Sequence, residues 1–203
     1  YAPQSKEDSD IFNRFVLNGY ELIQTWKGFV YHMTCRGSRF NPTLTQVGKE
    51  SDEWLAQNQR STRNFIRKWG HFVMHDRLMK PIIPPKFNIG LILNNANENS
   101  LFHLEPWFDK IWVHSSLVIP YINKEQENTV IDLSERVRTE FDEYDTDIVV
   151  KLDASELNQE TFGYIQKLSE IIHEHGELGT FELGNLTIEI HSLEEYQESL
   201  IFI

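Results

Sequence analysis

Apolar side chains recur at helical spacing near the start of the chain. The apolar positions of this stretch are Ile11, Phe12, Phe15 and Val16. Asp8 or Ser9 can cap such a helix, and Gly19 is well placed to end it. We therefore predict a short helix here. Residues 28–33 are a brief apolar, β-rich run before a polar loop that contains glycine, which predicts a strand leading into a loop.

A second helical pattern covers residues 51–80. Ser51 provides a capping-type start, because its hydroxyl can accept a hydrogen bond from a backbone amide of the first turn. Apolar residues then recur on successive turns: Trp54, Leu55, Phe65, Ile66, Trp69, Phe72 and Val73. The pattern predicts one long or broken helix.

From residue 81 onwards, strand-like and helix-like segments alternate. The strand-like runs are 86–93, 110–115 and 145–153. Residues 158–176 have an apolar stripe at helical spacing and end at a glycine. Residues 178–191 predict an antiparallel hairpin that turns through Gly184 and Asn185. This alternation predicts an α/β class (an α+β mixture) with a mixed sheet.

Charge divides the chain at the same place. The net charge of -12 is made of +4 from residues 1–80 and -16 from residues 81–203. Pro81, Pro84 and Pro85 lie at the boundary and disfavour helix in the residues before them. We therefore expect two units, a mostly helical one over 1–80 and a small α/β accessory domain over 81–203.

Composition excludes several classes of protein. With Cys35 as the single cysteine, no intramolecular disulfide can form, which is typical of a cytoplasmic protein. No run of about 18 apolar residues predicts a transmembrane segment. The acidic balance argues against binding to nucleic acid. The chain begins at Tyr1, and we expect it to be a piece of a longer polypeptide.

Three carboxylates gather at the start of the first predicted helix. Glu7, Asp8 and Asp10 lie where the helix dipole stabilises negative charge, so an acid there stays ionised and can act as a base. Helix capping by solvated acids explains the same residues without any catalysis. Both interpretations are open from these residues alone.

The features that follow the acids come in a recognisable order. EDSDIFNRFVLNGYEL (7–22) contains the acids, Arg14 and a Gly-Tyr pair, and FVYHMTCRGSRF (29–40) contains a strand ending in Val-Tyr-His and a basic loop. This order resembles the C-terminal part of the catalytic domain of family 2 glycosyltransferases with the GT-A fold. There, an E-D-x-D-L-x-x-R-x-x-x-x-G-Y segment carries the base and precedes a strand ending in V-Y-H. The match covers about residues 4–40, roughly a fifth of the chain.

The resemblance implies a role for each acid. Asp8 would be the general base that removes a proton from an acceptor hydroxyl in an inverting sugar transfer. Glu7 and Asp10 would hold the acceptor or shape the junction. Arg14 would pair with one of the acids, which is also what a purely structural salt bridge on a helix would do. The donor would be a nucleotide sugar, and the acceptor a glycan or another hydroxyl compound.

The loop after the predicted strand is the other implied site. His32 would be a third ligand for a divalent metal, Mn or Mg, that bridges the donor diphosphate. Arg36, Ser38 and Arg39 would donate to the phosphate oxygens, since Arg is suited to bidentate contacts. A packed or surface histidine and a solvated basic loop are the alternatives at these two places.

The resemblance also implies a missing part. Such enzymes bind the nucleotide through an N-terminal half with an acidic D-x-D motif, so we expect this chain to be inactive without it. The alternative class is a non-catalytic carbohydrate-binding or protein-interaction module. His71 and His75 are a weaker metal candidate, because four residues apart on a helix they would share a face. Trp69 and Trp112 are predicted to be core residues.

Overall fold

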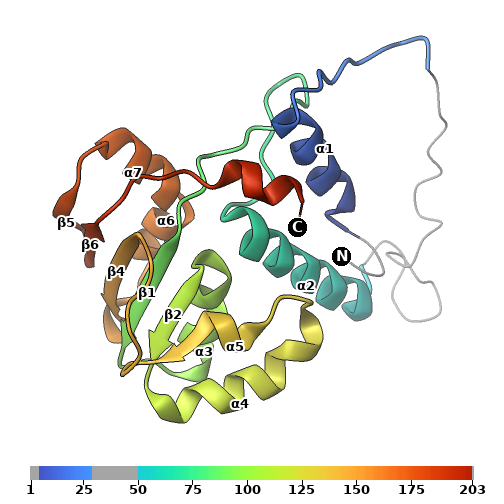
Figure 1. Ribbon diagram of the computed structural model, residues 1–203. Coiled ribbons are helices and arrows are strands. Elements are labelled where there is room, and N and C mark those ends of the chain that lie inside the picture. Colours follow the sequence, from blue (N-terminus) through green and yellow to red (C-terminus); the bar gives the residue numbers. More distant parts are fainter. Residues whose placement is uncertain (1–4, 29–49, 203) are drawn as a thin grey trace.

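The chain has a mixed α/β fold, as the sequence predicted. We describe it from a computed structural model over residues 5–28 and 50–202 (Figure 1). Within these ranges, two helices form the N-terminal part, and a sheet with its own helices forms the rest. No helix in these described ranges is long and apolar enough to cross a membrane.

The two N-terminal helices are α1 (Glu7–Leu17) and α2 (Asp52–Trp69). Ser51 caps α2 as predicted, since its side chain accepts from the backbone N–H of Trp54. The prediction of one long or broken helix over residues 51–80 is wrong, because α2 ends at Trp69 and residues 71–80 contain no helix. Gly70 causes this ending by adopting a left-handed backbone with φ of 78°.

The start of α1 also differs from the prediction. Neither Asp8 nor Ser9 caps the helix, which begins at Glu7 with Lys6 in the capping position, two residues before Asp8. Ser5 and Lys6 both have positive φ, 85° and 75°, so the chain turns sharply into the helix. All three acids therefore lie inside the first turn of α1 instead of before it.

Within the described residues, six strands form one mixed sheet in the order β3-β2-β1-β4-β6-β5. The strands are β1 (Ile89–Asn94), β2 (Lys110–Val113), β3 (Val137–Thr139), β4 (Ile148–Asp153), β5 (Gly179–Leu183) and β6 (Leu186–Ile190). The first four pair in parallel, and β6 pairs antiparallel with both β4 and β5. The hairpin predicted through Gly184 and Asn185 is the β5–β6 pair and is confirmed.

Short helices connect these strands. They are α3 (Glu98–Leu104), η2 (Glu105–Trp107), α4 (Ser115–Glu125), η3 (Gln126–Asn128), α5 (Leu133–Arg136), η4 (Ala154–Glu156), α6 (Gln159–Gln166) and α7 (Leu168–His175). A further short helix, η5 (Gln197–Ile201), follows the last strand, β6. The helix predicted over 158–176 is present but is divided at Lys167 into α6 and α7. Asn158 caps α6, and Gly176 ends α7 with φ of 66°.

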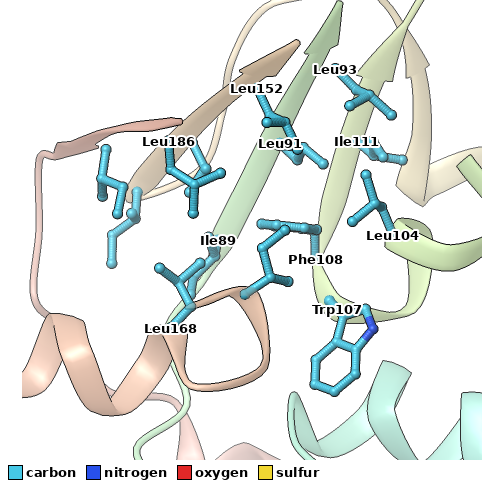
Figure 2. Packing of buried hydrophobic residues seen from close by; sticks show 14 of the residues in the cluster. Ile89, Leu91, Leu93, Leu104, Trp107, Phe108, Ile111, Leu152, Leu168 and Leu186 are labelled. Carbon is cyan, nitrogen blue, oxygen red and sulfur yellow. The ribbon is translucent and has the colours of Figure 1, made fainter. Parts of the chain in front are cut away.

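The main core lies on one face of the sheet. Alternate residues of β1, namely Ile89, Leu91 and Leu93, point to this face, as the strand period of two requires (Figure 2). Side chains from α3, α4, α5, α6 and α7 pack against them. The helices therefore bury this face, and the connecting helices of the parallel strands account for much of the cover.

A loop covers part of the other face of the sheet. Trp112, Ile92 and Val149 form a small buried cluster there. Tyr144 and Thr146 come from the connection between β3 and β4, and the Tyr144 ring packs edge-on against Trp112 at 4.9 Å between centroids. Both tryptophans predicted to be core residues, Trp69 and Trp112, are buried.

The end of the chain returns to the N-terminal helices. The backbone N–H of Tyr196 donates to Lys86 O at 2.7 Å, just before β1. Leu200 of η5 then packs with Phe65 and Trp69 of α2 in a separate hydrophobic cluster. In Figure 1, η5 lies beside α1 and above α2. The domain boundary at Pro81 stays a prediction, but residues that precede it and residues that follow it are in contact here.

We predict that Gly90→Ala destabilises the protein by about 1–3 kcal/mol, a typical cost of overpacking a core. A Cβ at Gly90 would lie 2.2 Å from the Trp112 ring and 2.6 Å from the Thr146 hydroxyl. Gly163→Ala in α6 is the matched control, because nothing lies within 4 Å of its added Cβ and alanine favours a helix. Urea unfolding measures both variants. Equal stability of Gly90→Ala and wild type would contradict this account of the second face.

Candidate functional site

The acid cluster of the sequence lies at the N-terminus of α1, and its members face different ways. Residues two apart on a helix are rotated by about 200°, so Asp8 and Asp10 cannot share a face. Asp10 is 8% exposed, whereas Asp8 and Glu7 are exposed. The structure thus separates a buried acid from two solvent-facing ones.

Asp10 attaches α1 to α2. Its Oδ1 accepts a hydrogen bond from the Trp69 indole N–H at 2.8 Å and lies 2.8 Å from the Lys68 ammonium. Its Oδ2 lies 3.9 Å from the Arg14 guanidinium one turn along α1. A buried carboxylate needs such partners, because without them its desolvation would be costly. The role of this acid in the structure is therefore to fix the position of α1.

Asp8 is in the opposite situation. It makes no hydrogen bond or ion pair with any other described residue, and its side chain is exposed in the first turn of α1. Asp8 is therefore an accessible carboxylate on a helix whose position other residues fix.

Arg14 joins α1 to the end of the chain. Besides its contact with Asp10, its Nε donates to the carbonyl oxygen of Ile201 at 2.8 Å. Leu17, at the last turn of α1, packs against the cluster that contains Leu200. The helix is thus held at its first turn by α2 and along its length by η5.

The other residues that the resemblance singled out lie outside the described ranges. These residues are His32, Arg36, Ser38 and Arg39. Among the residues that the structure does describe, no three His, Cys, Asp or Glu side chains are close enough to hold a metal ion. The described part of the chain therefore offers no metal site, and His32 stays a prediction.

The weaker metal candidate, His71 with His75, loses its basis. Both residues follow the end of α2, so they do not share a helix face, and His75 is exposed while His71 is 4% exposed. His71 Nδ1 donates to the Phe72 carbonyl, and its Nε2 is buried without a partner among the described residues. Burial, reinforced by Lys86, lowers the pKa of His71 to about 4, so it is neutral at pH 7.

A buried polar network joins α2 to the α/β unit. Glu105, at the start of η2, is fully buried, and arginine side chains from two helices contact its carboxylate. Arg67 of α2 donates to it at 2.7 Å and 3.0 Å, and Arg136 of α5 donates to it at 3.1 Å. Arg63, one turn before Arg67, lies 3.4 Å from the same carboxylate.

Two further groups complete this network. The Tyr121 hydroxyl donates to Glu105 at 3.0 Å, and Glu125 lies 3.3 Å from Arg63. Burial opposes the ionisation of Glu105, but the attraction of its three arginines is larger and lowers its pKa to about 2. Burial and the neighbouring Glu105 raise the pKa of Tyr121. The carboxylate is therefore charged and the phenol neutral across the physiological range.

A cavity of about 800 Å³ lies beside this network. It is bounded by α2, by the residues just before β1 and β2, by the segment 127–131 and by η5. Asp10 contributes to its wall, but Asp8 and Glu7 do not line it. Cavities that bind small ligands have volumes of about 300–1,000 Å³, so this one is large enough for an organic molecule.

The arginines of this region were not among the residues predicted to be functional from the sequence. Arg60, Arg63 and Arg67 recur at spacings of three and four, which places them on one side of α2. A basic stripe beside an apolar one was a usable signal of a buried charged surface. No comparable signal marks Glu105, whose arginine partners lie 31 to 42 residues away in the sequence.

No family model, curated protein or solved structure matches this chain. The functional assignment therefore depends on the residues and on the geometry described above.

We predict that Glu105→Gln destabilises the protein by about 3–5 kcal/mol at pH 7, because it leaves three buried guanidinium groups without their shared anion. Urea unfolding measures this loss. Glu98→Gln is the control, since Glu98 and Lys124 form an exposed pair and should contribute less than about 1 kcal/mol. A Glu105→Gln variant as stable as the control would contradict the network's structural role.

The same comparison has a pH dependence. The pKa of Glu105 is lowered on folding, from 4.5 to about 2, so its contribution is complete above about pH 4.5 and is lost as the pH falls towards 2. The difference in unfolding free energy between wild type and Glu105→Gln should therefore shrink over this range. A constant difference from pH 7 to pH 2.5 would show that Glu105 is not the titrating group.

We also predict that Asp10→Asn loosens α1. The amide side chain keeps the shape of the carboxylate but loses its attraction for Lys68 and Arg14, which should cost about 2 kcal/mol. Hydrogen–deuterium exchange should become faster across residues 10–17. Asp8→Asn is the matched control and should leave the exchange of α1 unchanged. Equal exchange in the two variants would mean that Asp10 does not hold the helix.

Proposed function

We propose that this chain is the acceptor-side part of an inverting glycosyltransferase, with Asp8 as its general base. The observation that carries the proposal is the contrast between Asp8 and Asp10. The Asp10 carboxylate makes structural contacts that fix α1, whereas the Asp8 carboxylate is accessible and has no partner among the described residues. The E-D-x-D spacing thus provides a positioning acid and a solvent-facing acid on one helix turn.

This arrangement fits the needs of a general base. The base must be ionised, must reach the hydroxyl proton, and must be held still relative to the substrate. The exposed position of Asp8 in the first turn of α1 gives an acceptor hydroxyl access to its carboxylate. Contacts of Asp10 with α2 and of Arg14 with η5 provide the rigidity.

The acceptor oxygen attacks the anomeric carbon of the donor sugar, and its proton passes to the Asp8 carboxylate as the new C–O bond forms. The bond from the anomeric carbon to the diphosphate breaks on the opposite side, which inverts the configuration. Glu7, which is also exposed beside Asp8, would accept hydrogen bonds from other acceptor hydroxyls. Asp10 and Arg14 act as positioning residues in this scheme.

Donor binding belongs to other parts of the polypeptide in this proposal. Arg36, Ser38 and Arg39 would contact the diphosphate, and His32 would contribute to binding Mn or Mg. No group of three His, Cys, Asp or Glu side chains among the described residues is placed to hold this metal. We expect the chain to need a separate nucleotide-binding half for activity.

The test is Asp8→Asn in the full-length polypeptide, assayed for sugar transfer from a panel of nucleotide sugars. Transfer should fall by about 10²–10⁴-fold, the usual contribution of general base catalysis, while donor binding is retained. Asp52→Asn is the matched control, because Asp52 is an exposed acid in the first turn of α2. It should leave transfer unchanged.

Other results of the assay decide against the proposal. Unchanged transfer by Asp8→Asn would remove this residue as the base. If the full-length wild type transfers no sugar from any donor but binds glycans, the chain belongs to a non-catalytic carbohydrate-binding module instead. Hydrogen–deuterium exchange on the same samples shows whether α1 is intact, so a loss of folding is not mistaken for a loss of the base.

A further inference from the structure

The cavity beside the Glu105 network has a lining of unusual charge for this protein. Its cations are Arg60, Arg67, Lys68, Lys86 and Arg136, and its acids are Asp10, Asp109 and Glu127. The lining thus has two more cations than acids, in a chain whose net charge is -12. A concave surface with excess positive charge attracts anions, because its low-dielectric walls focus the field.

The acids of the lining do not neutralise this charge evenly. Asp109 is occupied by Lys86, whose ammonium lies 2.7 Å and 2.9 Å from its two oxygens. Asp10 is occupied by Lys68. Glu127 is exposed at the rim. The three arginines around Glu105 share two buried carboxylates, so that network keeps a surplus positive charge.

Two guanidinium groups have N–H donors that a ligand could use. Arg60 donates to the side chain of Gln57 and pairs with no described carboxylate. Arg136 uses Nε and Nη2 for Glu105 and backbone carbonyls, and its Nη1 has no acceptor among the described residues. Both residues line the cavity. Guanidinium groups suit phosphate oxygens in geometry and charge.

The rest of the wall is apolar. Phe87 and Leu200 are buried at its inner side, and Val130 and Ile131 contribute from the segment after η3. An inorganic anion would leave this surface and most of the 800 Å³ unused. A ligand with both a phosphate group and an apolar or planar body would use both parts.

We propose that this cavity binds a small organic phosphate, with Arg60 and Arg136 on the phosphate and Phe87 and Leu200 against its body. The site is distinct from the proposed base, because Asp8 does not line the cavity and faces away from Asp10, which does. The proposal therefore does not depend on the glycosyltransferase assignment. Asp8→Asn should bind the ligand as the wild type does.

The experiment uses calorimetry with three probes: phenyl phosphate, inorganic phosphate and phenol. Phenyl phosphate should bind, inorganic phosphate should bind more weakly, and phenol should show no binding. Raising the salt concentration should weaken the binding of phenyl phosphate, since the attraction is partly electrostatic. Equal affinity for phenyl phosphate and inorganic phosphate would overturn the role of the apolar wall.

Variants then locate the bound probe. Arg60→Ala should raise the Kd for phenyl phosphate at least about tenfold, as expected for one charge-assisted contact. Arg77→Ala removes an exposed arginine outside the cavity and should change nothing. Val130 is fully exposed at the rim, so Val130→Glu should weaken binding and Val130→Lys should strengthen it without disturbing the core.

Two results would overturn the proposal. The first is that folded wild-type protein shows no detectable binding to phenyl phosphate at concentrations on the order of 10 mM. The second is binding that Arg60→Ala and Val130→Glu leave as strong as in Arg77→Ala, which would place the probe elsewhere on the protein. Thermal unfolding of each variant confirms that the comparison is made on folded protein.

Discussion

The arrangement of the whole molecule depends on the burial of one carboxylate. Glu105 has no contact with solvent and is held by arginines from α2 and α5. Removing either the carboxylate or its arginines destabilises the protein, because an unpaired buried charge costs several kcal/mol. The intact ion pair, by contrast, roughly balances the cost of its own desolvation. The network is therefore better understood as a device that specifies where α2 lies on the α/β unit than as a source of net stability.

The position of Asp8, the proposed catalytic acid, depends on the Glu105 network. Arg63 and Arg67 fix α2 against η2, and Lys68 and Trp69 follow directly on the same helix. These two residues hold Asp10, and Asp10 holds α1. Asp8 is thus connected to the sheet through two helices and two buried carboxylates. A change at Glu105 can disturb Asp8 without touching it, although no shared cavity or direct contact links the two residues.

The sequence predicted the elements better than their ends or their contacts. Local signals located α1, α2, the hairpin and the capping residue Ser51, because these depend on residues that are close together in the sequence. The helix over 51–80 was predicted too long because apolar Phe72 and Val73 continue the pattern past Gly70, whose left-handed backbone ends the helix. The pairing of Asp10 with Trp69 spans 59 residues, and no periodicity in the chain encodes it.

The division of charge along the chain has a consequence in the folded protein. The basic first part and the acidic second part place opposite charges against each other. Arg63 and Arg67 from the basic part meet Glu105 and Glu125 from the acidic part in a buried interface. Because the arginines outnumber the acids there once Arg136 is included, the complementarity is incomplete. The unbalanced charge lies next to a cavity, and this juxtaposition favours an anionic ligand at the junction of the two parts.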